Sequence, residues 1–384
     1  MRTPSRMWSL GKRLWVSRRE PERSFFFVDR PLVILQSDDW GRVGIRDHEG
    51  YEFLRQNGVQ LGKHPYDFYT LESAADVTAL MEMLLRHKDS SQRSPCLVMN
   101  FLLANLDFAR MAAREYQEVC LLFLSNGLPG QWKRPKLFAS YRAGIAEGLF
   151  YPALHGLTHF CRPVVEAALL NDNKRSELLR TLWKAETPFI HWRMPWIGYE
   201  YHSPEKPIAG FLGPENQQVL IRRAVEEFKK FFSKPPVSAC APGYRANDST
   251  HKAWRECGVR VAQNGSGAPM PPHFDESEML HLYRTIDIEP SSRELSVEKY
   301  VQLAENSFSR GVPAVVSVHS INFHSSLKDF RTTTLRLLDE FLSTLESRHS
   351  NLLYVTDEDM YQIVTEGKLT SDRHTTTVNV AQRR

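Results

Sequence analysis

The residues with the clearest capacity for chemistry are two adjacent carboxylates. Asp38 and Asp39 follow the apolar run from Pro31 to Leu35, and that run, rich in branched side chains, predicts a buried strand. Neighbouring residues of a strand point to opposite sides, but at a strand end the backbone can turn and bring both into one pocket. Two ionised carboxylates in one pocket repel each other, so a proton or a metal ion must neutralise one of them. An Asp-Asp turn that only closes the strand is the alternative.

Two histidines further along offer ligands for such an ion. His155 and His159 are four residues apart, and on a helical turn this spacing lets two imidazoles face one cation. A packed or surface histidine pair is the alternative. Asp39 would complete a set of two histidines and one carboxylate, which leaves positions open for water and substrate and suits zinc, but also iron, manganese, cobalt or nickel. Asp38 would then be free to act as a base.

The elements that must position these groups alternate between short apolar strands and amphipathic helices. Strands are expected near 31–37, 96–99, 149–154, 237–240, 259–262, 282–288, 314–318 and 352–355. Helices are expected near 47–57, 71–87, 136–148, 163–186, 217–232, 248–256, 297–310 and 334–348. This alternation predicts an α/β protein with a mostly parallel sheet, open or closed into a barrel.

Polar side chains follow the ends of these strands with a regularity that scattered surface residues would not show. They are Asp38, Asp39, Asn100, His155, Tyr244, Asn264, His319 and Asp357. In a parallel barrel the C-terminal strand ends converge on one face, where active sites are built. The sequence therefore predicts a site at the C-terminal strand ends.

Four segments occur in an order that resembles the polysaccharide deacetylase (NodB-homology) family. They are Asp38-Asp39, His155-x-x-x-His159, the segment 241–245 (Ala-Pro-Gly-Tyr-Arg) and the segment 316–319 (Val-Ser-Val-His). The resemblance extends from about residue 30 to about residue 365. It implies a distorted parallel (β/α) barrel of about seven strands, belonging to the glycoside hydrolase/deacetylase superfamily.

The resemblance also implies a role for each matching residue. Asp39, His155 and His159 would hold a divalent metal, with zinc the first choice, and Asp38 would be the general base. His319 would protonate the leaving amine, and the backbone N–H of Tyr244 would stabilise the oxyanion. A metal is needed because an amide carbonyl is a poor electrophile, which a cation polarises.

Two departures from the family pattern concern the tuning of the base. Cys240 stands where the family usually has an arginine that orients the base aspartate, and Arg245 is a candidate substitute from the other side of the turn. The segment 287–290 (Asp-Ile-Glu-Pro) is a partial match to the fourth motif.

Further residues are expected to contact substrate: Asn100, Trp196, Arg245 and His324. Trp196 lies in an aromatic insertion (192–199) that could form a wall for sugar faces, and the alternative is core packing over the barrel. His324 would be a second acid or a substrate contact, or otherwise a loop histidine.

Composition limits the remaining classes. The 384 residues carry a net charge of +4 without a dense basic block, which argues against nucleic-acid binding. Five scattered cysteines favour reduced thiols in the cytoplasm. No apolar run approaches a membrane span, but residues 1–30 form a basic arm or helix that could lie on a membrane surface, dock on the domain or stay loose. The barrel domain is expected to span 31–366, followed by a flexible tail at 367–384.

These expectations combine into a metal-dependent deacetylase, a hydrolase of linear amides, that removes an N-acyl group from an amino sugar of a polysaccharide or its cytoplasmic precursor. One alternative is a hydrolase of a small non-sugar amide or ureide on the same fold. The other is a catalytically silent saccharide-binding protein, which Cys240 favours and the retained acidic and histidine residues oppose.

Overall fold

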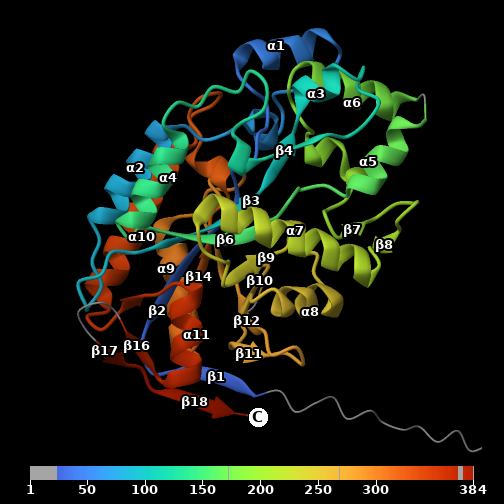
Figure 1. Cartoon of the computed structure of the whole chain (residues 1–384). Coiled ribbons are helices and arrows are strands. Elements are labelled where there is room, and N and C mark those ends of the chain that lie inside the picture. The colour runs from blue at the N-terminus through green and yellow to red at the C-terminus, as the bar shows by residue number, and fades with distance from the viewer. Residues whose placement is uncertain (1–23, 172, 268, 371–374, 384) are drawn as a thin grey trace, which may run out of the picture.

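A curled, mostly parallel sheet surrounded by helices forms the body of the protein (Figure 1). The computed structural model describes residues 24–171, 173–267, 269–370 and 375–383. The order of the neighbouring parallel strands is β13-β14-β2-β3-β6-β9-β10-β12. These strands are β2 (Leu32–Trp40), β3 (Leu97–Leu102), β6 (Phe150–Gly156), β9 (Ser238–Cys240), β10 (Val261–Asn264), β12 (Leu280–Tyr283), β13 (Ile286–Asp287) and β14 (Ala314–Ser317).

The chain itself closes this sheet into a ring. β12 pairs with β10 at one edge and β13 pairs with β14 at the other, yet only Arg284 and Thr285 separate the two strands. The N–H of Arg284 donates to the carbonyl of Asn264 at 3.2 Å, and that of Thr285 donates to the carbonyl of Val315 at 2.9 Å. If β12 and β13 are counted as one segment, the described part of the ring has the predicted seven strands.

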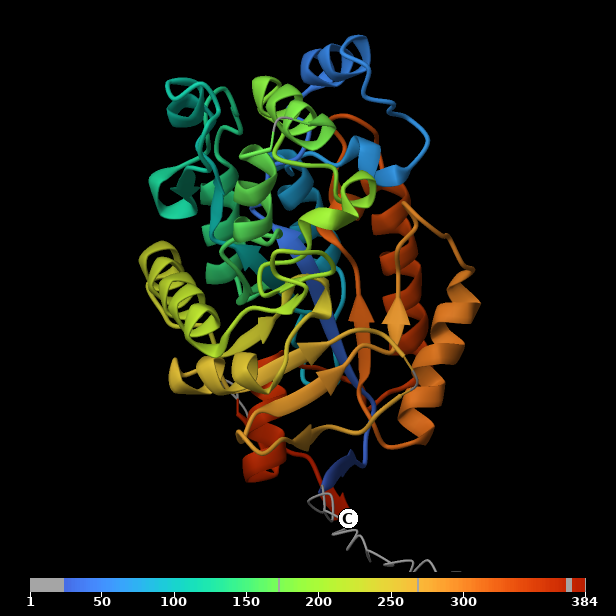
Figure 2. The same ribbon diagram turned by 90° about the vertical axis from the view of Figure 1, so that its right-hand side faces the viewer.

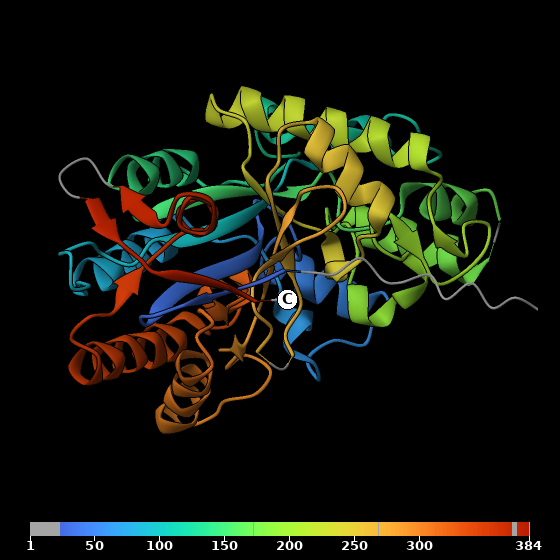
Figure 3. The same ribbon diagram turned by 90° about the horizontal axis from the view of Figure 1, so that it is seen from below.

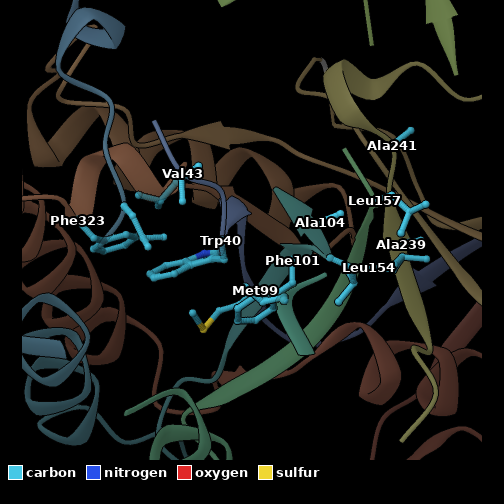
Figure 4. Close-up of a cluster of buried hydrophobic side chains, with 14 of the residues drawn as sticks. Trp40, Val43, Met99, Phe101, Ala104, Leu154, Leu157, Ala239, Ala241 and Phe323 are labelled. Carbon is cyan, nitrogen blue, oxygen red and sulfur yellow. The ribbon is translucent and has the colours of Figure 1, made fainter. Parts of the chain in front are cut away.

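The β2 strand shows why the ring is stable. All nine of its residues are buried, as expected for a parallel strand that is covered on both faces. The side chains of β2 alternate between two hydrophobic clusters. Val33 and Leu35 belong to the larger cluster, and Leu32 and Ile34 belong to the second. Figure 4 shows part of the large cluster, in which the Trp40 ring stacks on Phe323 with centroids 5.7 Å apart.

The described residues form eleven α-helices, and all but the third and the last overlap segments that the sequence predicts as helical. The helices are α1 (His48–Gln56), α2 (Ala74–Leu85), α3 (Phe108–Ala112), α4 (Leu137–Ala146), α5 (Arg162–Leu169), α6 (Lys174–Lys184), α7 (Pro214–Phe232), α8 (Asp248–Glu256), α9 (Val297–Ser309), α10 (Arg331–Arg348) and α11 (Asp357–Glu366). The single helix predicted over 163–186 is wrong, because it is split into α5 and α6. Asn173 caps α6 by accepting from the N–H groups of Arg175 and Ser176, so a new helix begins there.

Short helices and loops cover the C-terminal strand ends. In Figure 2 the strand arrows of the ring rise toward this layer, which contains α1, α3, α5 and α6 at the top of Figure 1. None of the described helices combines the length and apolar character needed to cross a bilayer.

The two ends of the described chain pair with each other below the ring (Figures 1 and 3). At the end of the predicted arm, β1 (Phe25–Val28) forms an antiparallel ladder with β18 (Val380–Arg383) and also pairs with β11 (His273–Phe274). The aromatic and branched residues of β1 favour a strand. Within the segment predicted as a tail, β16 (Lys368–Thr370) and β17 (Thr375–Thr377) pair before β18. The predicted basic helix at the N-terminus lies largely in residues 1–23, outside the described residues.

The remaining described strands are short. They are β4 (Ala104–Leu106), β5 (Leu121–Phe123), β7 (His202–Ser203), β8 (Gly210–Phe211) and β15 (Leu353–Tyr354). All five cysteines are free.

Candidate active site

A distortion at the end of β2 brings both aspartates to one pocket. The pairing register of β2 with β3 shifts between Ser37 and Trp40, and Asp39 has a φ of 74°. Such a left-handed residue turns the strand, as a β-bulge does, and Asp tolerates this conformation better than most residues. Asp38 and Asp39 are both 2% exposed and both line the same cavity.

Asp39 faces the two histidines. Its Oδ1 lies 3.3 Å from His159 Nε2 and 3.6 Å from His155 Nε2. The predicted helical turn is wrong: His155 lies in β6 and His159 in the loop after it, so a bend rather than helical spacing brings them together. Glu200 holds this bend, because its Oε1 accepts from the N–H groups of Leu157 and Thr158 at 2.9 and 3.0 Å.

The three side chains fit a divalent cation. His155 Nδ1 lies 2.8 Å from the carbonyl of Cys240, so it carries the proton and leaves Nε2 with a lone pair. That Nε2 is buried and has no hydrogen-bond partner among the described residues. Burial also lowers the pKa of His159 well below its usual value, despite the attraction of Asp39, so the imidazole stays neutral as a metal ligand must.

Asp38 is held by a guanidinium that sequence reasoning missed. Arg284 Nη2 and Nη1 donate to Asp38 Oδ1 and Oδ2 at 2.6 and 2.7 Å, a bidentate pair. Asn100 also donates to Oδ1, at 2.7 Å. Burial alone would raise the pKa of Asp38, but the opposing charge of Arg284 is decisive, and the pKa lies well below its usual value. Asp38 is therefore ionised throughout the physiological pH range.

Arg284 provides the guanidinium that the family pattern would place at position 240, where this chain has a cysteine. Its Nη2 lies 3.9 Å from Cys240 Sγ, so the small thiol leaves room for a guanidinium from the opposite side. Arg245, the substitute that the sequence suggested, is exposed and has no hydrogen bond or ion pair to Asp38 among the described residues. Sequence reasoning missed Arg284 because the strand expected over 282–288 places it inside a strand, whereas it directly follows β12 in the structure.

His319 lines the same cavity and lies close to Asp38. Its Nε2 is 3.7 Å from Asp38 Oδ2, and its Nδ1 is 2.6 Å from Glu289 Oε1. Burial opposes the charged imidazolium, but the attraction and hydrogen bond of Glu289 prevail and raise the pKa of His319 to about 9. Glu289 belongs to the partial fourth motif, and Asn322 in turn donates to its Oε2.

No family model and no curated protein matches the chain. It resembles the solved structure of a putative polysaccharide deacetylase from Mycobacterium smegmatis, with 13% identity and a TM-score of 0.45 over 91% of this chain and 94% of that one. A putative glycoside hydrolase/deacetylase from Parabacteroides distasonis has 10% identity and a TM-score of 0.48 over 89% and 73% of the two chains.

A family 4 carbohydrate esterase from Streptomyces lividans, solved in complex with acetate, has 12% identity and a TM-score of 0.34, with 84% and 90% covered. These neighbours are of the kind that the four motifs predict. The likeness is one of fold, so the chemistry rests on the residues of the cavity.

The cavity has a volume of about 310 Å³ and a largely aromatic wall. Its lining residues are Asp38, Asp39, Arg42, His64, Tyr66, His155, His159, His191, Trp192, Tyr199, Gly243, Tyr244 and His319. At the rim, His64 stacks on the 40% exposed Trp192 with ring centroids 4.5 Å apart. Gly243 is required, because a Cβ there would lie 2.3 Å from the Tyr199 ring.

None of the four predicted substrate contacts is among the residues that line the cavity, and Arg245 is exposed. Trp196 is 7% exposed and sits under Arg175, so it packs in the core, and Trp192 of the same insertion faces the cavity instead. His324 is fully buried, with Nε2 3.4 Å from Glu72. Asn100 is also fully buried and holds Asp38 and Gln263, which makes it a positioning residue.

Tyr244 reaches the site through its side chain. Its hydroxyl accepts from Arg284 Nη1 at 2.6 Å, whereas its backbone N–H donates to the carbonyl of Ala241 at 2.8 Å. The oxyanion role of that N–H stays a prediction, and it requires the turn Pro242–Tyr244 to release this bond.

Proposed function

We propose that this protein is a metal-dependent hydrolase that removes an N-acyl group, most simply acetyl, from an amino sugar. One observation carries the proposal: a candidate metal-ligand set, an ionised carboxylate and a protonated imidazole line the same cavity. Amide hydrolysis needs these three functions, because a water must lose a proton, a carbonyl must be polarised and an amine must be expelled.

Each protein group has a defined task in this reaction. Asp39, His155 and His159 would hold a divalent cation, which would supply Lewis acidity toward the amide oxygen and lower the pKa of a water. Asp38 accepts the proton of the attacking water, while Arg284 and Asn100 fix both of its oxygens. His319 is charged at neutral pH because of Glu289, so it can protonate the departing amine.

The wall of the cavity supports a sugar as the substrate. Its lining includes the aromatic side chains of Trp192, His64 and Tyr66, and aromatic side chains pack against the C–H groups of a pyranose ring. We place the enzyme in the cytoplasm, acting on a saccharide precursor, and the five free cysteines support a reducing compartment.

The test measures acetate release from N-acetylglucosamine oligomers and, in parallel, from simple N-acetyl amines. We expect the oligomers to be hydrolysed, a chelator to abolish turnover, and the Asp38→Asn variant to be inactive. Asp287→Asn is the matched control, since Asp287 is exposed on β13 and does not line the cavity. Hydrolysis of the simple amides alone would select the non-sugar alternative, and oligomer binding without turnover would select the silent protein.

A further inference from the structure

A second group of two histidines and one aspartate lies outside the cavity. His251 comes from α8, Asp275 from the loop after β11, and His281 from β12. None of the three lines the cavity of Asp38 and Asp39.

Its geometry matches that of the first set. Asp275 Oδ2 lies 3.2 Å from His251 Nδ1 and 3.1 Å from His281 Nε2. Ligands about 2.0–2.1 Å from a tetrahedral zinc ion are separated by roughly 3.3 Å. In the first set the corresponding separations from Asp39 are 3.3 and 3.6 Å.

The side chains are held in place before any ion binds. Asp275 Oδ1 accepts from the N–H groups of Ser277 and Met279, both at 2.9 Å, which leaves Oδ2 to face the imidazoles. The His281 ring is held by stacking on His273, with ring centroids 5.2 Å apart. The Asn264 NH2 group, which can only donate, lies 3.2 Å from His281 Nδ1, so Nε2 carries a proton toward Asp275 that an incoming ion must displace.

The set is also accessible. The side chains of His251, Asp275 and His281 are 13%, 18% and 7% exposed, so an ion can enter and retain a water as its fourth ligand. Two imidazoles with one carboxylate suit zinc and its first-row neighbours, whereas calcium and magnesium prefer oxygen ligands throughout.

We propose that His251, Asp275 and His281 form a second divalent-cation site of the zinc class, in which a water completes the three protein ligands. The ion ties α8 to β12, and β12 runs directly into Arg284, the partner of Asp38. The second site therefore fixes the segment that closes the ring and presents that guanidinium. Its existence does not depend on the function proposed for the first site.

Zinc stoichiometry tests this proposal on the full chain. The protein is stripped with a chelator, titrated with zinc near neutral pH, and analysed for bound metal by mass spectrometry. We expect two zinc ions per chain in the wild type and one in the His251→Gln/His281→Gln variant. We also expect one in His155→Gln/His159→Gln and two in His48→Gln, the control for an exposed histidine.

Two further measurements keep the outcome clear if a double variant folds poorly. The single His251→Gln change affects only a partly exposed side chain, and it should still remove one zinc. In His155→Gln/His159→Gln, zinc should raise the melting temperature through the second site alone. A wild type that binds one zinc, lost entirely in His155→Gln/His159→Gln, would overturn the second site and leave the proposed function intact. Loss of zinc only in the His251 variants would instead remove the first site.

Discussion

Replacing Arg284 with methionine should disable the proposed hydrolase, although Arg284 does not line the cavity. Arg284 is fully buried, and besides its two bonds to Asp38 it donates to Gln36, Ser317 and Gln263 at 3.0–3.1 Å. Methionine has a similar length but supplies none of these bonds. Asp38 would then be a buried carboxylate that keeps only the amide of Asn100 as a strong donor.

The expected magnitude follows from that buried charge. Breaking a buried ion pair by removing one partner costs about 3–5 kcal/mol of folding free energy. Asp38 can limit the cost by taking up a proton, because burial raises its pKa once Arg284 no longer opposes it. A protonated Asp38 cannot act as a base, so turnover at neutral pH should fall by roughly 10²–10⁴-fold.

Two assays separate these effects. Urea unfolding gives the loss of folding free energy, and acetate release measured against pH shows whether the acidic limb of the profile moves upward as the pKa of Asp38 rises. Arg336→Met, which removes an exposed arginine paired with Glu294 and Glu340, is the control and should change neither measurement.

Two more variants test the geometry itself. Arg284→Lys keeps the charge but not the bidentate fork, so it should recover stability better than turnover. Cys240→Arg added to Arg284→Met returns a guanidinium to the other side of Asp38 and should restore part of the activity. If Arg284→Met retains turnover within about threefold, general-base catalysis by a carboxylate that depends on this arginine is refuted.

The remaining predictions concern pH and metal. His319 owes its pKa of about 9 to Glu289, so turnover should fall as pH rises through about 9, and Glu289→Gln should move this alkaline limb downward in the profile of kcat/KM. Burial raises the pKa of Glu200 from 4.5 to about 7, which corresponds to about 3 kcal/mol of stability that is present below pH 4.5 and lost as pH rises through 7. Glu200→Gln should flatten that dependence in urea unfolding, and an unchanged slope would contradict it. Chelation should abolish acetate release, added zinc should restore it, and Asp39→Asn should respond to neither.

The sequence predicts which residues lie at the strand ends better than it predicts which of these residues contact each other. Asp38, Asp39, His155 and His319 could be placed on one face because each follows an apolar strand, and that register survives in the structure. The long amphipathic helices are also visible as periodicity. The division of 163–186 was missed because a polar Asn cap, not a proline or glycine, restarts the helix.

Other features depend on contacts between residues far apart in the chain. The pairing of Phe25–Val28 with Val380–Arg383 joins segments that no local pattern connects. Within the aromatic insertion 192–199, Trp196 was expected to contact substrate, but Trp192 is the tryptophan that lines the cavity, because spacing in an irregular loop does not show which ring is buried. His324 was expected to be a second acid or a substrate contact, or otherwise a loop histidine. It lies in the core, with Nε2 3.4 Å from Glu72.

The position of Arg284 shows what a site of this kind constrains. Asp38 needs a positive group within hydrogen-bond distance. Any part of the chain that reaches this position can supply that group. A barrel brings every strand end to the same face, so a guanidinium from the β12–β13 junction reaches Asp38 as well as one from β9 could. Arg284 Nη2 lies 3.9 Å from the Cys240 thiol, so a second arginine at position 240 would crowd the first. On this argument the variant carrying Cys240→Arg alone should be the less stable protein, because two buried guanidinium groups would compete for one carboxylate.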